Sequence, residues 1–123
     1  MKAIGRWWLS ILIMCLLFYL SSRPGSYLAP TYLGNALANK AAHLLWYGML
    51  CLSFYKATKS IPVAILLTTL YGVSDEIHQV FVFNRTGKIA DVAIDWAAAS
   101  FVGLILWKFY PYLPNKLKSW LEK

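Results

Sequence analysis

Charged residues are scarce in this sequence, and acidic residues are the scarcest of them. Lys, Arg, Asp and Glu make up 14% of the 123 residues, against about 25% in a typical soluble domain. Hydrophobic residues make up 59%. This balance excludes an ordinary soluble enzyme and indicates a polytopic membrane protein, and the length of residues 1–123 allows a single domain.

Cysteines, histidines and metal-binding motifs are also scarce. The two cysteines lie in separate apolar runs, which excludes a disulfide framework. The two histidines belong to no His-Glu-x-x-His motif, so the sequence identifies neither a metal nor a cofactor. Twelve Lys and Arg give a net charge of +7, but they form no basic stripe away from the segment ends. We therefore expect membrane lipids, and no nucleic acid, as partners.

The few polar groups lie close together. Four of the five acidic residues fall within residues 75–95, between two of the most apolar runs of the chain. Ionisable residues inside a membrane segment are costly, so a cluster of them marks a candidate functional site. The cluster comprises Asp75, Glu76, His78, Gln79, Arg85, Asp91 and Asp95.

Four apolar segments predict an all-α bundle of four membrane-spanning helices followed by a short interfacial helix near the C-terminus. The first segment is similar to a signal peptide, but it lacks a small-residue cleavage site and is interpreted as an uncleaved span. The third and fourth segments reach the length of a span only if they include the acidic residues. The predicted spans are about residues 5–22, 37–55, 61–81 and 91–110.

The distribution of Lys and Arg predicts the orientation. Eight of them fall on the side of both termini and four on the other side, which places both termini in the cytoplasm. The start of the second span, the end of the third and the start of the fourth then share the outer side. The polar residues on them are expected to form one outward-facing pocket.

Helical spacing groups these residues into faces, one on each of the last three predicted spans. The faces are Lys40, His43 and Tyr47; Asp75, His78 and Gln79; and Asp91 with Asp95. Polar faces on neighbouring helices must meet or remain unpaired in lipid, and the second arrangement is costly. We therefore expect the three faces to meet.

Several chemical roles fit this pocket. An Asp paired with a His provides a general base and its orienting group, so the candidate catalytic residues are Asp75, Glu76, His78 and Asp91. The candidate substrate-binding residues are Lys40, His43, Tyr47, Gln79, Arg85 and Asp95. Arg85, on the outer loop, suits a bidentate grip on an anionic headgroup. The nitrogen and oxygen atoms also suffice for a divalent metal, whereas in a purely structural alternative the basic groups only neutralise buried acids.

These motifs resemble the VanZ-like family of bacterial membrane proteins, named for a member associated with teicoplanin resistance. The family pattern is Lys-x-x-His-x-x-x-Tyr, then Asp-Glu-x-x-Gln, an Arg, and Asp-x-x-x-Asn-x-x-Gly. The chain follows this pattern over about residues 37–107 and departs from it at Asp95, where Asn is usual, and at Ala98, where Gly is usual. The resemblance implies a bacterial cytoplasmic (inner) membrane and a link to glycopeptide resistance, but no particular reaction.

The leading functional prediction is a VanZ-like envelope protein that lowers susceptibility to glycopeptides such as teicoplanin. It would bind or modify a cell-surface lipid or a lipid-linked wall precursor. An intramembrane hydrolase or transferase using Asp75, His78 and Asp91 is an alternative. A small proton- or cation-coupled transporter is a weaker alternative, because the inner halves of the last three spans offer few polar groups.

Overall fold

The computed structural model describes residues 3–23, 31–83, 85 and 87–123, and all regular structure within these residues is helical. This confirms the predicted all-α class. The elements are α1 (Ile4–Ser22), α2 (Tyr32–Thr58), α3 (Ile61–Val80), α4 (Ile89–Lys108), the 3₁₀ turn η1 (Tyr110–Tyr112) and α5 (Asn115–Glu122).

Local sequence signals set the ends of the central helices. The Thr31 Oγ1 accepts a hydrogen bond of 3.0 Å from the Gly34 N–H and caps the start of α2. Lys59 ends α2 in the left-handed conformation, with φ at 58°. Pro62 lies in the first turn of α3, where its missing N–H is not needed. Because of the Thr31 cap, α2 begins earlier than the predicted 37–55 segment, and it also ends later.

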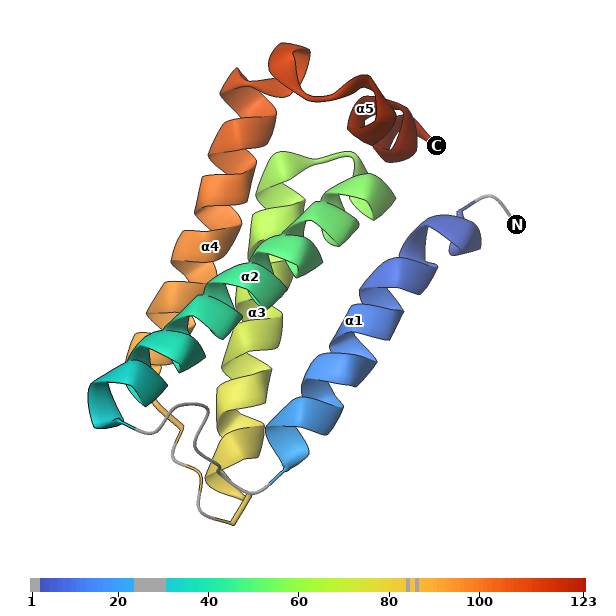
Figure 1. Ribbon diagram of the computed structural model, residues 1–123. Helices are drawn as coiled ribbons and strands as arrows, with labels where there is room; N and C mark the ends of the chain where they lie inside the picture. The colour runs from blue at the N-terminus through green and yellow to red at the C-terminus, as the bar shows by residue number, and fades with distance from the viewer. Residues whose placement is uncertain (1–2, 24–30, 84, 86) are drawn as a thin grey trace.

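Helices α2, α3 and α4 pack against one another, and α1 packs against α2 and α3 (Figure 1). Ala98 and Ala99 on α4 are buried in the core, and such small residues allow the axes of packed helices to approach closely. The larger core side chains include Tyr47, Leu50 and Phe54 from α2. Helix α2 therefore contributes the largest side chains at the centre of the bundle.

Polar contacts attach α1 to the other helices. The hydroxyl of Ser10 donates a hydrogen bond of 3.0 Å to the hydroxyl of Ser53 on α2, and both serines are buried. The hydroxyl of Tyr71 on α3 donates a hydrogen bond of 2.8 Å to the carbonyl oxygen of Met14. These contacts fix the position of α1 along its neighbours.

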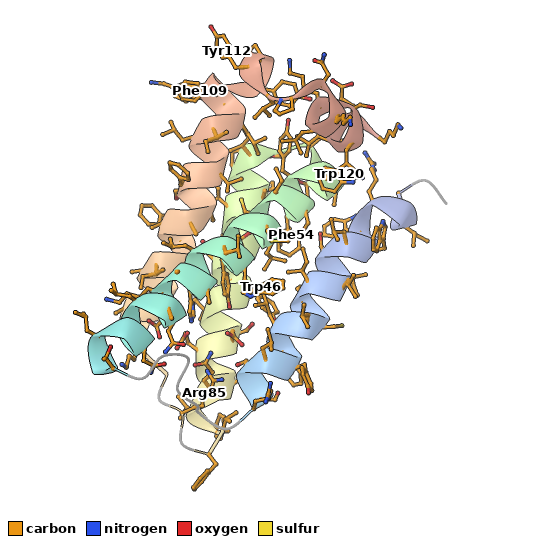
Figure 2. The ribbon with its side chains drawn as sticks, viewed as in Figure 1. Trp46, Phe54, Arg85, Phe109, Tyr112 and Trp120 are labelled. Carbon is orange, nitrogen blue, oxygen red and sulfur yellow. The ribbon has the colours of Figure 1, made fainter. Side chains whose placement is uncertain are left out.

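The C-terminal helix folds back onto the bundle. The Lys56 ammonium lies 4.1 Å from the ring centroid of Trp120 on α5, a cation–π contact, and the Lys59 ammonium donates a hydrogen bond to the carbonyl oxygen of Leu121. Figure 2 shows Trp120 at one end of the bundle and Arg85 at the opposite end. The start of α1 lies at the same end as α5 (Figure 1).

Two of the described helices, α1 and α4, are long and apolar enough to cross a membrane. They indicate a membrane protein by length and composition. Helix α2 carries Lys40 and His43, and α3 carries much of the polar cluster. The crossing of the bilayer by these two helices stays a prediction.

Candidate functional site

A part-buried His–Asp pair joins α2 to α4. The His43 Nδ1 lies 2.8 Å from the Asp95 Oδ1, and the Asp95 side chain is completely buried. The His43 side chain keeps 20% of its surface exposed. Its ring also lies parallel to the ring of Tyr47, with centroids 5.7 Å apart. The pair therefore has one buried end at Asp95 and one accessible end at His43.

The carboxylate of Asp75 joins α3 to α2. The Tyr47 hydroxyl donates a hydrogen bond of 3.0 Å to the Asp75 Oδ2, and the side-chain amide of Gln79 donates one of 3.1 Å to the same oxygen. The other oxygen, Oδ1, is buried and has no hydrogen-bond partner among the described residues. Tyr47, Asp75 and Gln79 thus meet as the helical faces predict.

The carboxylate of Glu76 holds the loop that leads into α4. The Lys88 backbone N–H donates a hydrogen bond of 2.9 Å to the Glu76 Oε2. A Cβ at Gly87 would lie 2.5 Å from the Glu76 carbonyl oxygen, so only glycine allows the loop to approach α3 this closely. The Glu76 Oε1 is buried and, like the Asp75 Oδ1, finds no partner in the described part of the chain.

Gly72 provides the space in which the Asp95 carboxylate lies. A Cβ at Gly72 would lie 2.8 Å from the Asp95 Oδ2, and this oxygen has no partner among the residues that the structure describes. The Asp95 carboxylate on α4 therefore approaches α3 at Gly72, a position without a side chain. Burying a carboxylate oxygen without a partner is costly, which makes this arrangement unusual for a purely structural acid.

The three helices together form one polar centre. His43, Glu76 and Asp95 come from α2, α3 and α4, and each offers a ligand atom within 4.8 Å of the others. Asp91, half-buried in the first turn of α4, is close enough for its charge to act on all three. Tyr47 links Asp75 to this centre, because its hydroxyl donates to the Asp75 carboxylate and its ring stacks on His43. This arrangement can bind a cation, accept hydrogen bonds or move a proton through His43.

Three predicted site residues lie elsewhere. The His78 Nε2 lies 2.9 Å from the Ser22 hydroxyl and its ring lies 4.5 Å from that of Phe18, so this ring packs on α1 rather than in the centre. Arg85 donates hydrogen bonds of 3.1 Å and 3.2 Å to the carbonyl oxygens of Arg23 and Leu20, where α1 ends. Lys40 is exposed on α2. Their predicted catalytic and binding roles stay predictions.

Sequence reasoning missed the two glycines, Gly72 and Gly87. The signal for Gly72 was present, because Gly72 precedes Asp75 by three residues and Gln79 by seven and therefore shares their helical face. The signal for Gly87 was weaker, since a glycine in a loop usually indicates only a turn.

Comparison with known proteins places this site in a family. The family model described as VanZ/LLP1 matches residues 6–111. The chain belongs to the VanZ/LLP1 family. The matched region begins within the first turn of α1, includes α2–α4 and every residue of the polar centre, and ends before α5. No curated protein and no solved structure matches the chain.

Proposed function

We propose that this VanZ/LLP1 chain is a multi-pass protein of the bacterial cytoplasmic membrane and that α1–α4 all cross the bilayer. Helices α2 and α3 support this because both expose large apolar side chains, while the two acidic groups of α3 are buried. A helix of 20 residues, the length of α3, spans about 30 Å, which matches the hydrocarbon core. The exposed apolar side chains are Leu44, Leu45 and Met49 on α2 and Leu66, Leu70 and Ile77 on α3.

The basic residues at the α5 end support the proposed orientation. Lys56, Lys59 and Lys108 lie at the ends of α2 and α4 that adjoin α5 and η1, and the sequence of α5 adds further lysines. The positive-inside rule places this end in the cytoplasm. The polar centre then lies in the outer half of the membrane.

Single cysteines at the two ends of the bundle test this topology. In a chain whose own cysteines, Cys15 and Cys51, are replaced by alanine, we expect an impermeant maleimide to label Phe83→Cys on intact cells. Ser119→Cys on α5 should be labelled only after lysis. Both positions are exposed, so reagent access alone does not separate them. The reverse labelling pattern would refute the orientation.

The function that the site supports best is binding or modification of a cell-surface lipid or lipid-linked wall precursor. Such an activity would lower susceptibility to glycopeptides such as teicoplanin. One observation carries the proposal: Asp75, Glu76 and Asp95 each bury a carboxylate oxygen without a partner among the described residues. Unsatisfied buried acceptors are costly, and a ligand with hydroxyl or amine donors would satisfy them.

A second candidate is an intramembrane hydrolase or transferase, and the His43–Asp95 contact favours it. A carboxylate 2.8 Å from an imidazole nitrogen holds the ring in one orientation, and the ring can then act as a general base. His43 is partly exposed, so a reacting group can approach it. His43 thus replaces His78 as the best-placed base, because His78 contacts α1.

The charge of Asp75 tests the site against a purely structural role. We expect Asp75→Asn to remove the contribution of the chain to teicoplanin resistance, while the amount of protein in the membrane stays unchanged. Asparagine keeps an acceptor for Tyr47 and Gln79, and loss of the charge relieves desolvation. The readout is the minimal inhibitory concentration in cells expressing each variant at matched levels.

The matched control is Glu122→Gln, which neutralises an acidic residue on α5, outside the polar centre. It should leave the inhibitory concentration unchanged. Full resistance in Asp75→Asn would contradict a functional role for this carboxylate, and failure of the variant to accumulate would assign Asp75 to the fold.

A further inference from the structure

We propose that His43, Glu76 and Asp95 bind a divalent metal ion of the Zn²⁺ or Mn²⁺ type. The three residues come from three helices, and their ligand atoms lie within 4.8 Å of one another. Ligands around a tetrahedral ion at about 2.1 Å lie about 3.4 Å apart. Adjustments of less than about 1 Å by each side chain therefore close the site around an ion.

The free oxygens of two buried acids point to a ligand. Asp95 is 0% exposed and Glu76 is 6% exposed. The Asp95 Oδ1 is hydrogen-bonded to His43, and the Glu76 Oε2 accepts a hydrogen bond from the Lys88 N–H. The other oxygen of each carboxylate, the Asp95 Oδ2 and the Glu76 Oε1, has no partner among the described residues. A cation that both free oxygens bind would remove the cost of burying them.

The charge balance also favours a cation. Asp75, Glu76 and Asp95 are all buried, and His43 supplies at most one positive charge. Within the described residues, the His43–Asp95 pair is the one ion pair of the centre, and the Arg85 guanidinium donates to backbone carbonyls of α1 instead. A divalent ion supplies the missing positive charge where no Lys or Arg side chain does.

The ligand types select the class of ion. One imidazole nitrogen and two carboxylates suit Zn²⁺ and Mn²⁺, whereas Ca²⁺ and Mg²⁺ prefer oxygen ligands alone. Supporting contacts of the kind that orient metal ligands are present. The Tyr47 ring stacks on His43, the Lys88 N–H holds Glu76, and Gly72 leaves room for the Asp95 Oδ2.

Metal binding to the purified chain tests this inference without any assay of resistance, so its failure would leave the proposed lipid-related function standing. The full chain is purified in detergent, stripped with EDTA and titrated separately with ZnCl₂, MnCl₂ and MgCl₂. We expect about one Zn²⁺ or Mn²⁺ per chain by elemental analysis, with a raised melting temperature, since a ligand that binds only the folded state stabilises it. MgCl₂ should bind at least tenfold more weakly.

Variants identify the ligands. Glu76→Gln and Asp95→Asn should each weaken Zn²⁺ or Mn²⁺ binding at least tenfold, and Glu122→Gln on α5 should bind as the unaltered chain does. Failure of the unaltered chain to bind either ion would overturn the proposal, whatever the variants do. Equal binding in Glu76→Gln and Asp95→Asn would overturn it as well, because the ion would then lie at another site.

Discussion

Replacing His43 by alanine is expected to lower the free energy of unfolding by about 3–5 kcal/mol, because the change leaves a buried charge without its partner. Asp95 is completely buried, and the His43 ring is the one hydrogen-bond partner of its Oδ1 among the described side chains. Unfolding of the purified chain by SDS in mixed micelles measures this free energy. EDTA is present throughout, so that a bound ion does not contribute.

The matched variant Asp95→Asn separates the loss of the ion pair from the loss of the imidazole volume. In the Asp95→Asn background the asparagine carries no charge, so His43→Ala should cost less than in the unaltered chain by at least about 1 kcal/mol. Equal costs in the two backgrounds would show that the pair contributes no coupling energy. The cost of His43→Ala would then reflect packing on Tyr47 alone.

A methyl group at Gly87 is expected to be the second most damaging small change. The Cβ of Gly87→Ala would lie 2.5 Å from the Glu76 carbonyl oxygen and 2.9 Å from the Val80 Cγ2. A backbone oxygen cannot move aside as a flexible side chain can, so the loop must shift away from α3. We expect a loss of about 1–3 kcal/mol and a weaker hold of the Lys88 N–H on the Glu76 carboxylate.

Gly5→Ala is the control for this substitution, because nothing lies within 4 Å of a Cβ built at Gly5. Alanine favours a helix over glycine by about 1 kcal/mol, so the melting temperature of Gly5→Ala in detergent should stay or rise. The same measurement on Gly87→Ala should show a clear fall. An unchanged melting temperature in Gly87→Ala would mean that the loop tolerates a side chain there.

The sequence was sufficient to predict the helices, because apolar runs separated by turn residues leave few alternatives in a chain this hydrophobic. Pro62 at the start of α3 is one such local signal. Local patterns also predicted that Tyr47, Asp75 and Gln79 would meet. Buried polar groups in an apolar protein must find partners, and these residues face one another at compatible helical positions.

The sequence was not sufficient to divide the polar residues of α3 among its neighbours. About 100° separates successive residues of a helix, so His78 lies about 60° to one side of Asp75 and Gln79 lies about 40° to the other. Helix α3 packs against α1, α2 and α4, and a small rotation decides which helix each side chain meets. His78 therefore contacts α1, whereas Glu76 faces the loop that leads into α4.

Arg85 illustrates a different limit of local reasoning. A loop arginine can bind any acceptor within reach, and the final carbonyls of a helix lack partners within that helix. The guanidinium accordingly contacts the carbonyl oxygens of Leu20 and Arg23, where α1 ends. Only the packing of α1 beside the end of α3 brings these carbonyl oxygens near Arg85. No sequence pattern around Arg85 indicates this packing.

The attachments of α1 bear on whether another hydrophobic segment can take its place. Its contacts with the rest of the protein involve Ser10, Met14, Leu20 and Ser22, so they extend over most of the helix. Inserting one residue midway would rotate the following part by about 100° and turn Ser22 away from His78. Helix α1 is thus not interchangeable with a generic signal anchor of equal length and hydropathy, although its composition resembles one.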